Sequence, residues 1–532
     1  MQYEKFCYDN TIEEIGYEIS REIETKKNEV IVKEFFFREK KILLPAILLL
    51  TLLAHFPTFQ NGFTESWDSE NAPYIVGNPL ITSLSAKNIG KMFSAQFDGH
   101  YHPITMLSLA LNYHTGGLDP FQYHVTNMVL HMLNTVAVFF LIGALFQNPA
   151  LAALCAVLFG VHTQHVESIS WLSERKNLLY STFYLFSLIS YVKCIDLSQH
   201  NRRRSRFFLF LTGFFFILSL LSKSQAVVLP ATLLVIDLVK RTPFTTRMFV
   251  EKAPFFLISA TVGIIARKAQ EAAWGGLQET PFSLFERSVF ACYSFIEYQL
   301  KLLFPINLSA KYIYPERIDG HIPYGYLIYI IPTVLILVTT VLSLKKSKTV
   351  AFGLLFFSIN IFFLLKQFKV PYGNYIMADR YTYMASIGFF VLVGTAVNSL
   401  QEKTFFKKPL FIACTLYVGA LSFMTFERTK IWRDDLTFYS ALMGDTPAYS
   451  EGWFNVALIK ERNGLYTDAV DIYDRYADIK PDYGLTYYNR GVIKSSHLGD
   501  QEGAVQDYSV ALSKDLDDSI RFAAYYQRSL AY

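Results

Sequence analysis

Two acidic residues that follow the first long apolar stretch are the first candidates for catalysis. Asp68 and Glu70 lie in the sequence TESWDSEN, a few positions beyond that stretch. At a membrane surface a carboxylate stays solvated enough to ionise, and it can still face a pocket between helices. One of the two is therefore a candidate general base. The alternative is that both are simply solvated side chains of an exposed loop.

Basic residues near the ends of later apolar stretches could bind an anion. Arginine and lysine side chains pair readily with phosphate. Each of them alone could instead extend toward lipid headgroups. If their loops meet above one helical bundle, together they favour an anionic, lipid-linked ligand. The residues concerned are Arg175, Lys176, Lys223, Arg267, Lys268, Lys369 and Arg380.

A histidine pair has a spacing that is also found at metal sites. His162, His165 and Glu167 follow the pattern His-x-x-His-x-Glu, in which residues three apart share a helix face. We regard a metal as the weaker interpretation, because the run ends an apolar stretch and has no carboxylate-rich partner. No metal and no other cofactor is expected. The further polar residues expected at the pocket are His102, His162, His165, Glu174 and Asp379.

The composition indicates that a membrane domain positions these residues. Of the 532 residues, 52% are hydrophobic and 18% are charged, against about 25% charged in an average soluble domain. This excludes a disordered chain and makes an ordinary soluble enzyme a poor match. The net charge of +4 is too balanced for a protein that binds nucleic acid. The five cysteines have no Cys-x-x-Cys spacing, so neither a disulfide framework nor a zinc site is predicted.

Eleven apolar stretches are candidates to cross a bilayer. The stretch 284–303 is also apolar, but four charged residues interrupt it, and a charge near the middle of a bilayer costs at least about 2.5 kcal/mol. We expect 284–303 to be an interfacial or partly buried helix. The eleven stretches are 42–58, 124–146, 149–168, 177–194, 206–222, 225–239, 252–266, 325–343, 350–366, 381–399 and 409–426.

Clusters of basic residues give the orientation. Cytoplasmic loops collect lysine and arginine, and the segments 201–206, 240–247, 345–348 and 402–408 are all strongly basic. All four segments can face the cytoplasm only if the chain crosses the membrane an even number of times between 247 and 345. The count of eleven spans satisfies this condition. This predicts a cytoplasmic N-terminal segment 1–41, a membrane domain 42–427 and a large extracytoplasmic loop 59–123.

The segment after the last span carries a helical repeat. Residues 450–481 match the 34-residue tetratricopeptide pattern, with Trp453, Ala457, Ala469 and Pro481 in their expected places. A second copy begins at Tyr487, and a third begins near 525 and is incomplete. Stacked repeats form a groove suited to an extended peptide. The alternative is that the repeats, predicted over 447–532 and outside the membrane, merely pack on the membrane domain.

Several motifs in this order resemble one known family. It is the family of transmembrane and tetratricopeptide-repeat protein O-mannosyltransferases, within the GT-C class of polyprenyl-phosphate-sugar transferases. The resemblance covers about residues 45–532. The motifs that carry it are WDSENAPYIVGNPLITSLSAKNI, YHPITMLSLALNY, GLDPFQYHVTNMVLHMLNT, VHTQHVESISWLSERKNLLY and ADRYTYMASIGFF.

The resemblance implies an all-α GT-C bundle followed by a tetratricopeptide solenoid, and a specific reaction. Such enzymes move a monosaccharide, mannose in the best known members, from a polyprenyl or dolichyl phosphate to Ser or Thr of exported proteins. Members carry adjacent acidic residues after the loop tryptophan, whereas here Ser69 separates Asp68 from Glu70. The expected location is the endoplasmic reticulum membrane in a eukaryote and the plasma or inner membrane in a prokaryote.

The resemblance and the charges together suggest a mechanism. Asp68 takes the proton of an acceptor hydroxyl as that hydroxyl attacks the sugar, in one displacement with inversion. Arg175, Lys176, Arg380, Lys223 and Arg267 bind the donor phosphate, and the repeats hold the acceptor protein. The partners expected are thus the lipid-linked sugar, the acceptor segments and membrane lipid, with no nucleic acid.

Three other functions remain open at this stage. One is a transferase that acts on lipid or glycan acceptors. Another is a non-catalytic scaffold whose repeats recruit partners, although eleven spans are more than an anchor requires. The third is a transporter, which would place ionisable residues near the middle of the bilayer and often repeats its spans.

Overall fold

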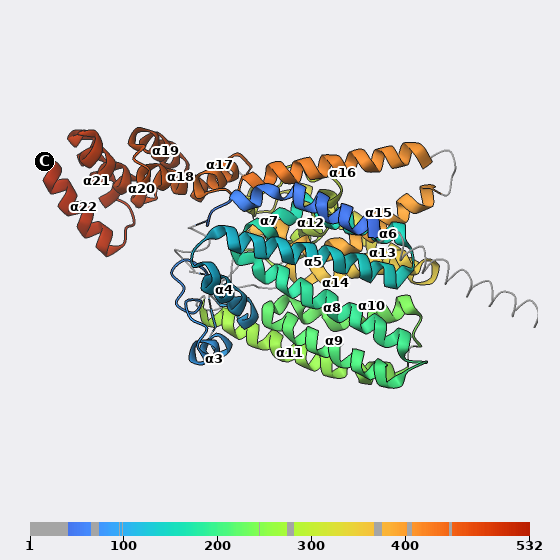
Figure 1. The fold of residues 1–532 in the computed structure, drawn as a ribbon. Coiled ribbons are helices and arrows are strands. Elements are labelled where there is room, and N and C mark those ends of the chain that lie inside the picture. The colour runs from blue at the N-terminus through green and yellow to red at the C-terminus, as the bar shows by residue number, and fades with distance from the viewer. Residues whose placement is uncertain are drawn as a thin grey trace, which may run out of the picture.

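The computed structural model describes residues 41–64, 74–94, 96–97, 99–243, 245–273, 281–365, 375–401, 407–445 and 450–532. Asp68, Glu70 and Lys369, and the predicted N-terminal segment apart from Lys41, lie outside these ranges. The described chain is a long helical bundle from one end of which the C-terminal helices project (Figure 1). The helices α3 and α4 lie at the same end, which we call the loop end.

The bundle is built from long apolar helices. Each of the eleven predicted crossings coincides with a helix, and 284–303 forms the separate helix α12 (Leu284–Leu303). The helices at the eleven crossings are Lys41–Ala54, α5 (Pro120–Phe146), α6 (Pro149–Val161), α8 (Arg175–Leu197), α9 (Arg202–Ser222), α10 (Leu229–Lys240), α11 (Thr246–Ala273), α13 (Ile330–Lys346), α14 (Lys348–Ile361), α15 (Thr382–Gln401) and α16 (Lys407–Lys430).

Within the described ranges, seven helices are long and apolar enough to cross a membrane. An eighth candidate is the pair Pro149–Val161 and Thr163–Ser170, which is bent by 53°. Lys41–Ala54 and Lys348–Leu364 are apolar but shorter. The chain is a multi-pass helical membrane protein, and the count of eleven crossings stays a prediction.

The predicted loop 59–123 contains structure of its own. It begins within the 3-10 helix η1 (Phe56–Gln60) and holds α3 (Ala86–Ser94) and α4 (Pro103–Gly116). Its apolar side chains, Tyr74, Ile75 and Ile81 among them, form a separate small core with Leu109 and Tyr123. Asp119 caps α5 by accepting a hydrogen bond from the backbone N–H of Phe121 at 3.1 Å.

Short elements connect the long helices. They are η2 (Thr163–His165), α7 (Val166–Ser170), η3 (Leu172–Glu174), η4 (Ser224–Val228), η5 (Tyr324–Tyr329), η6 (Phe362–Leu364) and η7 (Asp379–Tyr381). A two-stranded antiparallel sheet pairs β1 (Tyr312–Ile313) with β2 (Tyr375–Met377). The sheet therefore holds the segment before α15 against the loop after α12.

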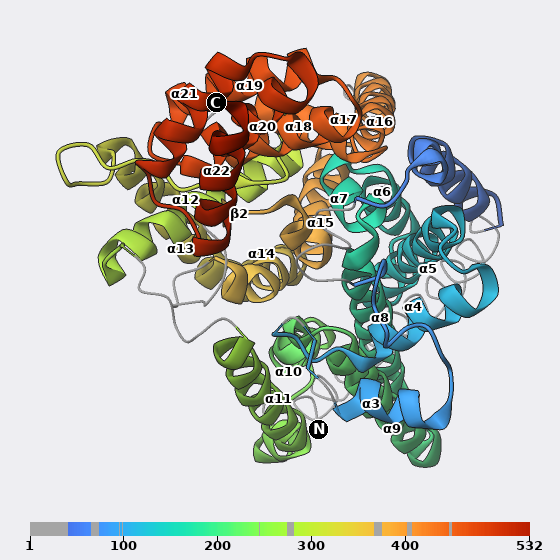
Figure 2. The same cartoon turned by 90° about the vertical axis from the view of Figure 1, so that its left-hand side faces the viewer.

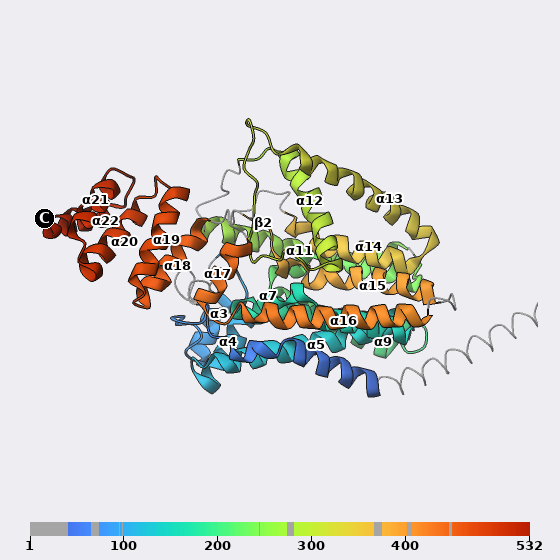
Figure 3. The ribbon, with the colours of Figure 1, turned by 90° about the horizontal axis from the view of Figure 1, so that it is seen from above.

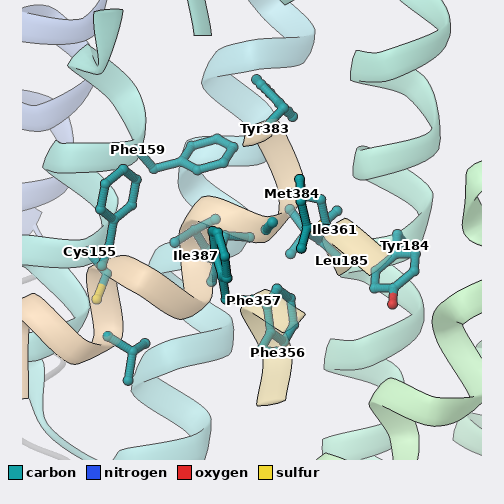
Figure 4. Packing of buried hydrophobic residues seen from close by; sticks show 14 of the residues in the cluster. Cys155, Phe159, Tyr184, Leu185, Phe356, Phe357, Ile361, Tyr383, Met384 and Ile387 are labelled. Carbon is teal, nitrogen blue, oxygen red and sulfur yellow. The ribbon is translucent and has the colours of Figure 1, made fainter. Parts of the chain in front are cut away.

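The bundle core is closely packed where α14 and α15 cross. A Cβ atom at Gly388 would lie 2.5 Å from the carbonyl oxygen of Gly353, so only glycine allows this approach of the two backbones. Figure 4 shows Phe356, Phe357 and Ile387 packed together beside this crossing. The start of α15 is thereby fixed relative to the rest of the bundle.

The C-terminal helices pack as successive neighbours. They are α17 (Asp435–Asp445), α18 (Ser450–Arg462), α19 (Tyr466–Ile479), α20 (Gly484–Ile493), the π-helix η9 (Lys494–Leu498), α21 (Gln501–Leu512) and α22 (Asp518–Ala531). Ala457 of α18 and Ala469 of α19 are fully buried against Tyr473. Helix pairs with small residues at these positions are what a tetratricopeptide motif requires; the assignment of the repeats stays a prediction.

Candidate functional site

The break between α6 and α8 brings polar side chains to the loop end. After α6 ends at Val161, the chain turns through η2, α7 and η3 before α8 begins. Glu167 lies on α7, and Glu174 directly precedes α8, where the positive end of the helix dipole favours a carboxylate. Both carboxylates are buried, with 4% and 3% of their side chains exposed. Each therefore requires a cation nearby.

Arg380 supplies the cation for Glu167. Its backbone N–H donates to Glu167 Oε2 at 2.7 Å, and its guanidinium donates to Glu167 Oε1. The residue lies in η7, directly after β2 and before α15. The carbonyl oxygen of Arg380 accepts from the amide of Asn177 on α8 at 2.9 Å. Arg380 thus joins three segments that are far apart in the sequence.

Glu174 is surrounded by three cations. Lys176 Nζ lies 3.3 Å from Glu174 Oε1, Lys223 Nζ lies 3.2 Å from Oε2, and Arg380 Nε lies 3.6 Å from Oε1. We call Lys176, Lys223 and Arg380 the cation cluster. Among the described residues, these three cations and the carboxylates of Glu167 and Glu174 together carry a net charge of +1. Such a buried excess of positive charge is suited to an anion.

Lys223 extends into the cluster from the end of α9. Its ammonium donates to Asn177 Oδ1 at 3.0 Å as well as to Glu174. Burial lowers the pKa of Lys223 to about 8; Glu174 opposes this effect, whereas Lys176 and Arg380 reinforce it. Lys223 is therefore mostly charged at neutral pH and loses its charge at mildly alkaline pH.

Aromatic rings cover the cation cluster. Lys176 Nζ lies 4.5 Å from the ring centre of Tyr74 and 5.5 Å from that of Trp171. The Arg380 guanidinium lies 5.2 Å from the Trp171 ring and 5.0 Å from the Tyr381 ring. Ring faces attract cations without neutralising them. The rings therefore hold the cationic side chains in place, and the cations keep their full charge.

Arg175, predicted to bind phosphate, points elsewhere. Its guanidinium is fully buried and donates to Asn127 Oδ1 at 2.8 Å and to the Tyr123 carbonyl at 2.7 Å. It also donates to Asn112 Oδ1. These partners belong to α4 and α5, so Arg175 joins those helices to α8. Its neighbour Lys176 faces the cation cluster instead.

Arg267 is not brought to the cluster either. It lies on α11, where 67% of its side chain is exposed and it pairs with Glu271 one turn later at 2.8 Å. Of the predicted phosphate ligands within the described ranges, Lys176, Lys223 and Arg380 are therefore the ones that the fold brings together.

The three histidines predicted for the pocket lie in two places. His162 contacts the Leu302 carbonyl and His165 contacts the Phe159 carbonyl, at 3.0 and 2.8 Å, and both are fully buried in the bundle. His102 lies nearer the cluster, stacked on Tyr74 with ring centres 5.4 Å apart. Its Nε2 atom is buried and has no hydrogen-bond partner among the described residues. Within those residues no group of three or more His, Cys, Asp or Glu side chains could hold a metal.

Asp379 lies beside the cluster with partners of its own. Tyr312 of β1 donates to Asp379 Oδ1 at 2.8 Å, and Arg428 of α16 lies 4.0 Å from Oδ2. Arg428, Tyr74 and Trp171 were not among the residues predicted for the site, and Glu167 was considered only as part of a metal-like spacing. Arg428 could have been found from the sequence. It is a basic residue near the end of the last apolar stretch, on the side that should be poor in lysine and arginine.

Comparison with known proteins supports the resemblance seen in the motifs. The chain is 26% identical over 443 residues to Protein O-mannosyl-transferase F38B6.6 of Caenorhabditis elegans, a match covering 78% of this chain and 60% of that protein. It is 23% identical over 483 residues to human Protein O-mannosyl-transferase TMTC1, covering 80% and 54%. For human Protein O-mannosyl-transferase TMTC3 the identity is 22%, covering 73% and 46%. The predicted resemblance to protein O-mannosyl-transferases is thus confirmed.

The chain spans roughly half the length of the relatives it matches. No protein-family model matches it. Among solved structures, an oligosaccharyltransferase of Archaeoglobus fulgidus tethered with an acceptor peptide aligns at a TM-score of 0.41 and 12% identity, covering 78% of this chain and 59% of that one. This structural likeness is too distant to support a further conclusion.

Proposed function

We propose that the chain is an integral-membrane glycosyltransferase of GT-C type. It moves a monosaccharide, mannose by similarity to its relatives, from a polyprenyl or dolichyl phosphate to Ser or Thr of exported proteins. The observation that carries this proposal is the cation cluster of Lys176, Lys223 and Arg380 around Glu174 at the loop end. The relatives named protein O-mannosyl-transferases supply the class of reaction.

The cluster suits the charge changes of this reaction. A lipid phosphodiester carries one negative charge, which matches the net charge of +1 on Lys176, Lys223, Arg380, Glu167 and Glu174. As the bond from the anomeric carbon to the phosphate oxygen breaks, the bonding electrons pass to the leaving phosphate. Preorganised cations stabilise that developing charge in a site shielded from water. Because Arg175 is committed to α4 and α5, we assign the phosphate to Lys176, Lys223 and Arg380 alone.

The remaining parts of the mechanism come from the first loop and the C-terminal helices. Asp68 takes the proton of the acceptor hydroxyl while that oxygen bonds to the anomeric carbon with inversion. Support for Asp68 is its place directly after Trp67 in the motif shared with the family. The C-terminal helices project from the loop end, where α3 and α4 also lie (Figure 1), and are in a position to hold the acceptor.

We propose that the loop end faces away from the cytoplasm. The α8–α9 and α13–α14 connections, the end of α15 and the start of α16 lie at the opposite end of the bundle (Figures 1 and 3). Basic residues gather in or beside these connections, among them Arg202, Arg203, Lys345, Lys346 and Lys407. Cytoplasmic ends of membrane helices carry such an excess of positive charge.

The test is transfer by the purified full chain in nanodiscs. Radiolabelled polyprenyl-phosphate mannose is supplied with a Ser/Thr-rich peptide pool and with a matched pool in which Ala replaces Ser and Thr. We expect label on the first pool only, and none with Asp68→Asn. The control variant Lys430→Gln removes a half-exposed cation paired with Glu427 and should transfer normally.

Other outcomes would replace the proposal. Label that enters lipid or glycan but not peptide would favour the rival class of acceptor. A folded chain that transfers nothing from several polyprenyl-phosphate sugars would favour the scaffold. Full transfer by Asp68→Asn would remove Asp68 as the base while leaving the reaction class intact.

A further inference from the structure

Two tryptophans connect the cation cluster to the base of the C-terminal helices. Trp171 follows α7, and Trp432 follows α16. Their rings stack with centres 6.3 Å apart and planes 15° from parallel. Trp432 is 2% exposed, and its ring also contacts Phe438 of α17, with ring centres 4.7 Å apart.

The Trp171 ring is also the surface on which two cations of the cluster rest. Lys176 Nζ lies 5.5 Å and the Arg380 guanidinium 5.2 Å from its centre. A shift of this ring would therefore move or release two of the three cations proposed to bind phosphate. The position of Trp171 in turn depends on Trp432, against which it is stacked.

The stack belongs to one apolar cluster that crosses the junction. The cluster that contains Trp432 also includes Val166 of α7, Phe438 and Leu442 of α17, and Val456 of α18. Since closely packed side chains transmit displacement, a change in the position of α17 and α18 reaches the partly buried Trp171 through the buried side chains of this cluster. Figure 2 shows α17 and α18 beside α16 and α7, viewed from the loop end.

A polar link runs parallel to the stack. Arg428 of α16 pairs with Asp445 at the end of α17 at 2.8 Å. Its other terminal nitrogen lies 4.0 Å from the carboxylate of Asp379, the residue before Arg380. Two independent contacts thus join α17 to the segments that carry the cation cluster.

We propose that Trp171 and Trp432 are positioning residues through which the seating of the C-terminal helices sets the affinity of the cation cluster for lipid phosphate. This inference rests on the proposed function and deepens it. An acceptor segment bound to the C-terminal helices changes the donor affinity, and by linkage the donor changes the acceptor affinity by the same factor.

The experiment compares Trp432→Ala, Trp432→Phe and the unaltered full chain in nanodiscs. Binding of dolichyl phosphate and the KM for polyprenyl-phosphate mannose are measured together with the thermal midpoint. Loss of the stack should raise the dissociation constant for dolichyl phosphate and the KM for the donor about fivefold each. This is the equivalent of one cation–π contact. At saturating donor, kcat should change less than twofold, and Trp432→Phe, which keeps an aromatic ring, should restore most of the affinity.

A milder variant and a control complete the test. Asp445→Asn removes the charge of a one-third exposed carboxylate that pairs with Arg428. It should raise the dissociation constant for dolichyl phosphate about twofold. Phe210→Ala breaks a stacked pair with Phe214 on the exposed side of α9 and should leave the donor constants unchanged.

The outcomes separate this inference from the proposed function. Unchanged donor constants in Trp432→Ala and Asp445→Asn, with normal transfer by the unaltered chain, would overturn the inference alone. If Trp432→Ala lowered the thermal midpoint without changing the donor affinity, the stack would have a purely structural role. An unaltered chain that neither binds dolichyl phosphate nor transfers sugar would overturn both.

Discussion

Arg380 and Glu167 are joined by two hydrogen bonds, one from the backbone N–H at 2.7 Å and one from the guanidinium. The pair fixes the start of α15 against α7, across 213 positions of sequence. Of the remaining guanidinium nitrogens, Nε faces Glu174 at 3.6 Å, and the second terminal nitrogen donates to the Tyr375 hydroxyl at 3.2 Å. The proposed phosphate site therefore depends on a carboxylate that need not touch the ligand.

Glu167→Gln tests this dependence. The substitution keeps the shape of the side chain but leaves the buried Arg380 without its closest counter-charge. Breaking a buried ion pair from one side costs about 3–5 kcal/mol, so the thermal midpoint in detergent should fall sharply and the donor KM should rise. Glu427→Gln, in an exposed pair, should change neither. Equal stability of the two variants would show that the pair is not needed.

Lys223 should make donor binding sensitive to pH. Burial lowers its pKa to about 8 in the free site, while a phosphodiester keeps its single negative charge throughout this range. Lys223 is charged below this pKa and neutral above it, so the donor KM should rise as the pH increases through 8. In Lys223→Arg the charge persists at all these pH values, and the profile between pH 7 and 9 should be flat. A rise of equal size in both proteins would assign the pH effect to another group.

Arg175 should matter for stability and not for the donor. Its guanidinium donates to the Tyr123 carbonyl and to the amides of Asn112 and Asn127. Arg175→Lys cannot satisfy these acceptors together, and the free energy of unfolding should fall by about 2–4 kcal/mol. The donor KM of the folded fraction should stay the same. A raised KM at unchanged stability would return Arg175 to the phosphate site.

The crossing of α14 and α15 gives a test of the bundle itself. In Gly388→Ala the new Cβ would lie 2.5 Å from the Gly353 carbonyl oxygen, so the two helices must separate. We expect a loss of about 1–3 kcal/mol in stability and a fall in activity, since Arg380 lies in η7 directly before α15. Gly419→Ala on α16, where a Cβ meets nothing within 4 Å, is the matched control. Similar thermal midpoints for the two variants would contradict the packing described.

Much of this fold could be predicted from the sequence, because hydrophobic runs in a membrane chain report helices directly. Each predicted crossing is a helix, and 284–303 is the separate helix α12. Lengths were harder to predict: α10 has 12 residues and α6 ends at Val161. A run of apolar letters does not show where a helix breaks, and the break after Val161 is the one that positions Glu167 and Glu174.

The site was predictable only in part. Lys176, Lys223 and Arg380 could be selected because each lies at the end of an apolar stretch on the side where cations are unexpected. Arg175 satisfied the same criterion, yet it faces α4 and α5, since adjacent residues at a helix start point in different directions. Glu167 was noticed for a metal spacing, whereas its partner is Arg380. Such long-range pairs depend on how the helices pack, which local patterns do not encode.

The most direct test of the cation cluster is the binding of dolichyl phosphate to the full chain in nanodiscs, measured without turnover. The account predicts that Lys176→Gln combined with Lys223→Gln weakens binding at least about 30-fold, since two charge-assisted contacts are lost. Lys430→Gln, which removes a cation outside the cluster, should bind like the unaltered chain. Equal affinity in all three proteins would contradict the assignment of the cluster to the donor phosphate.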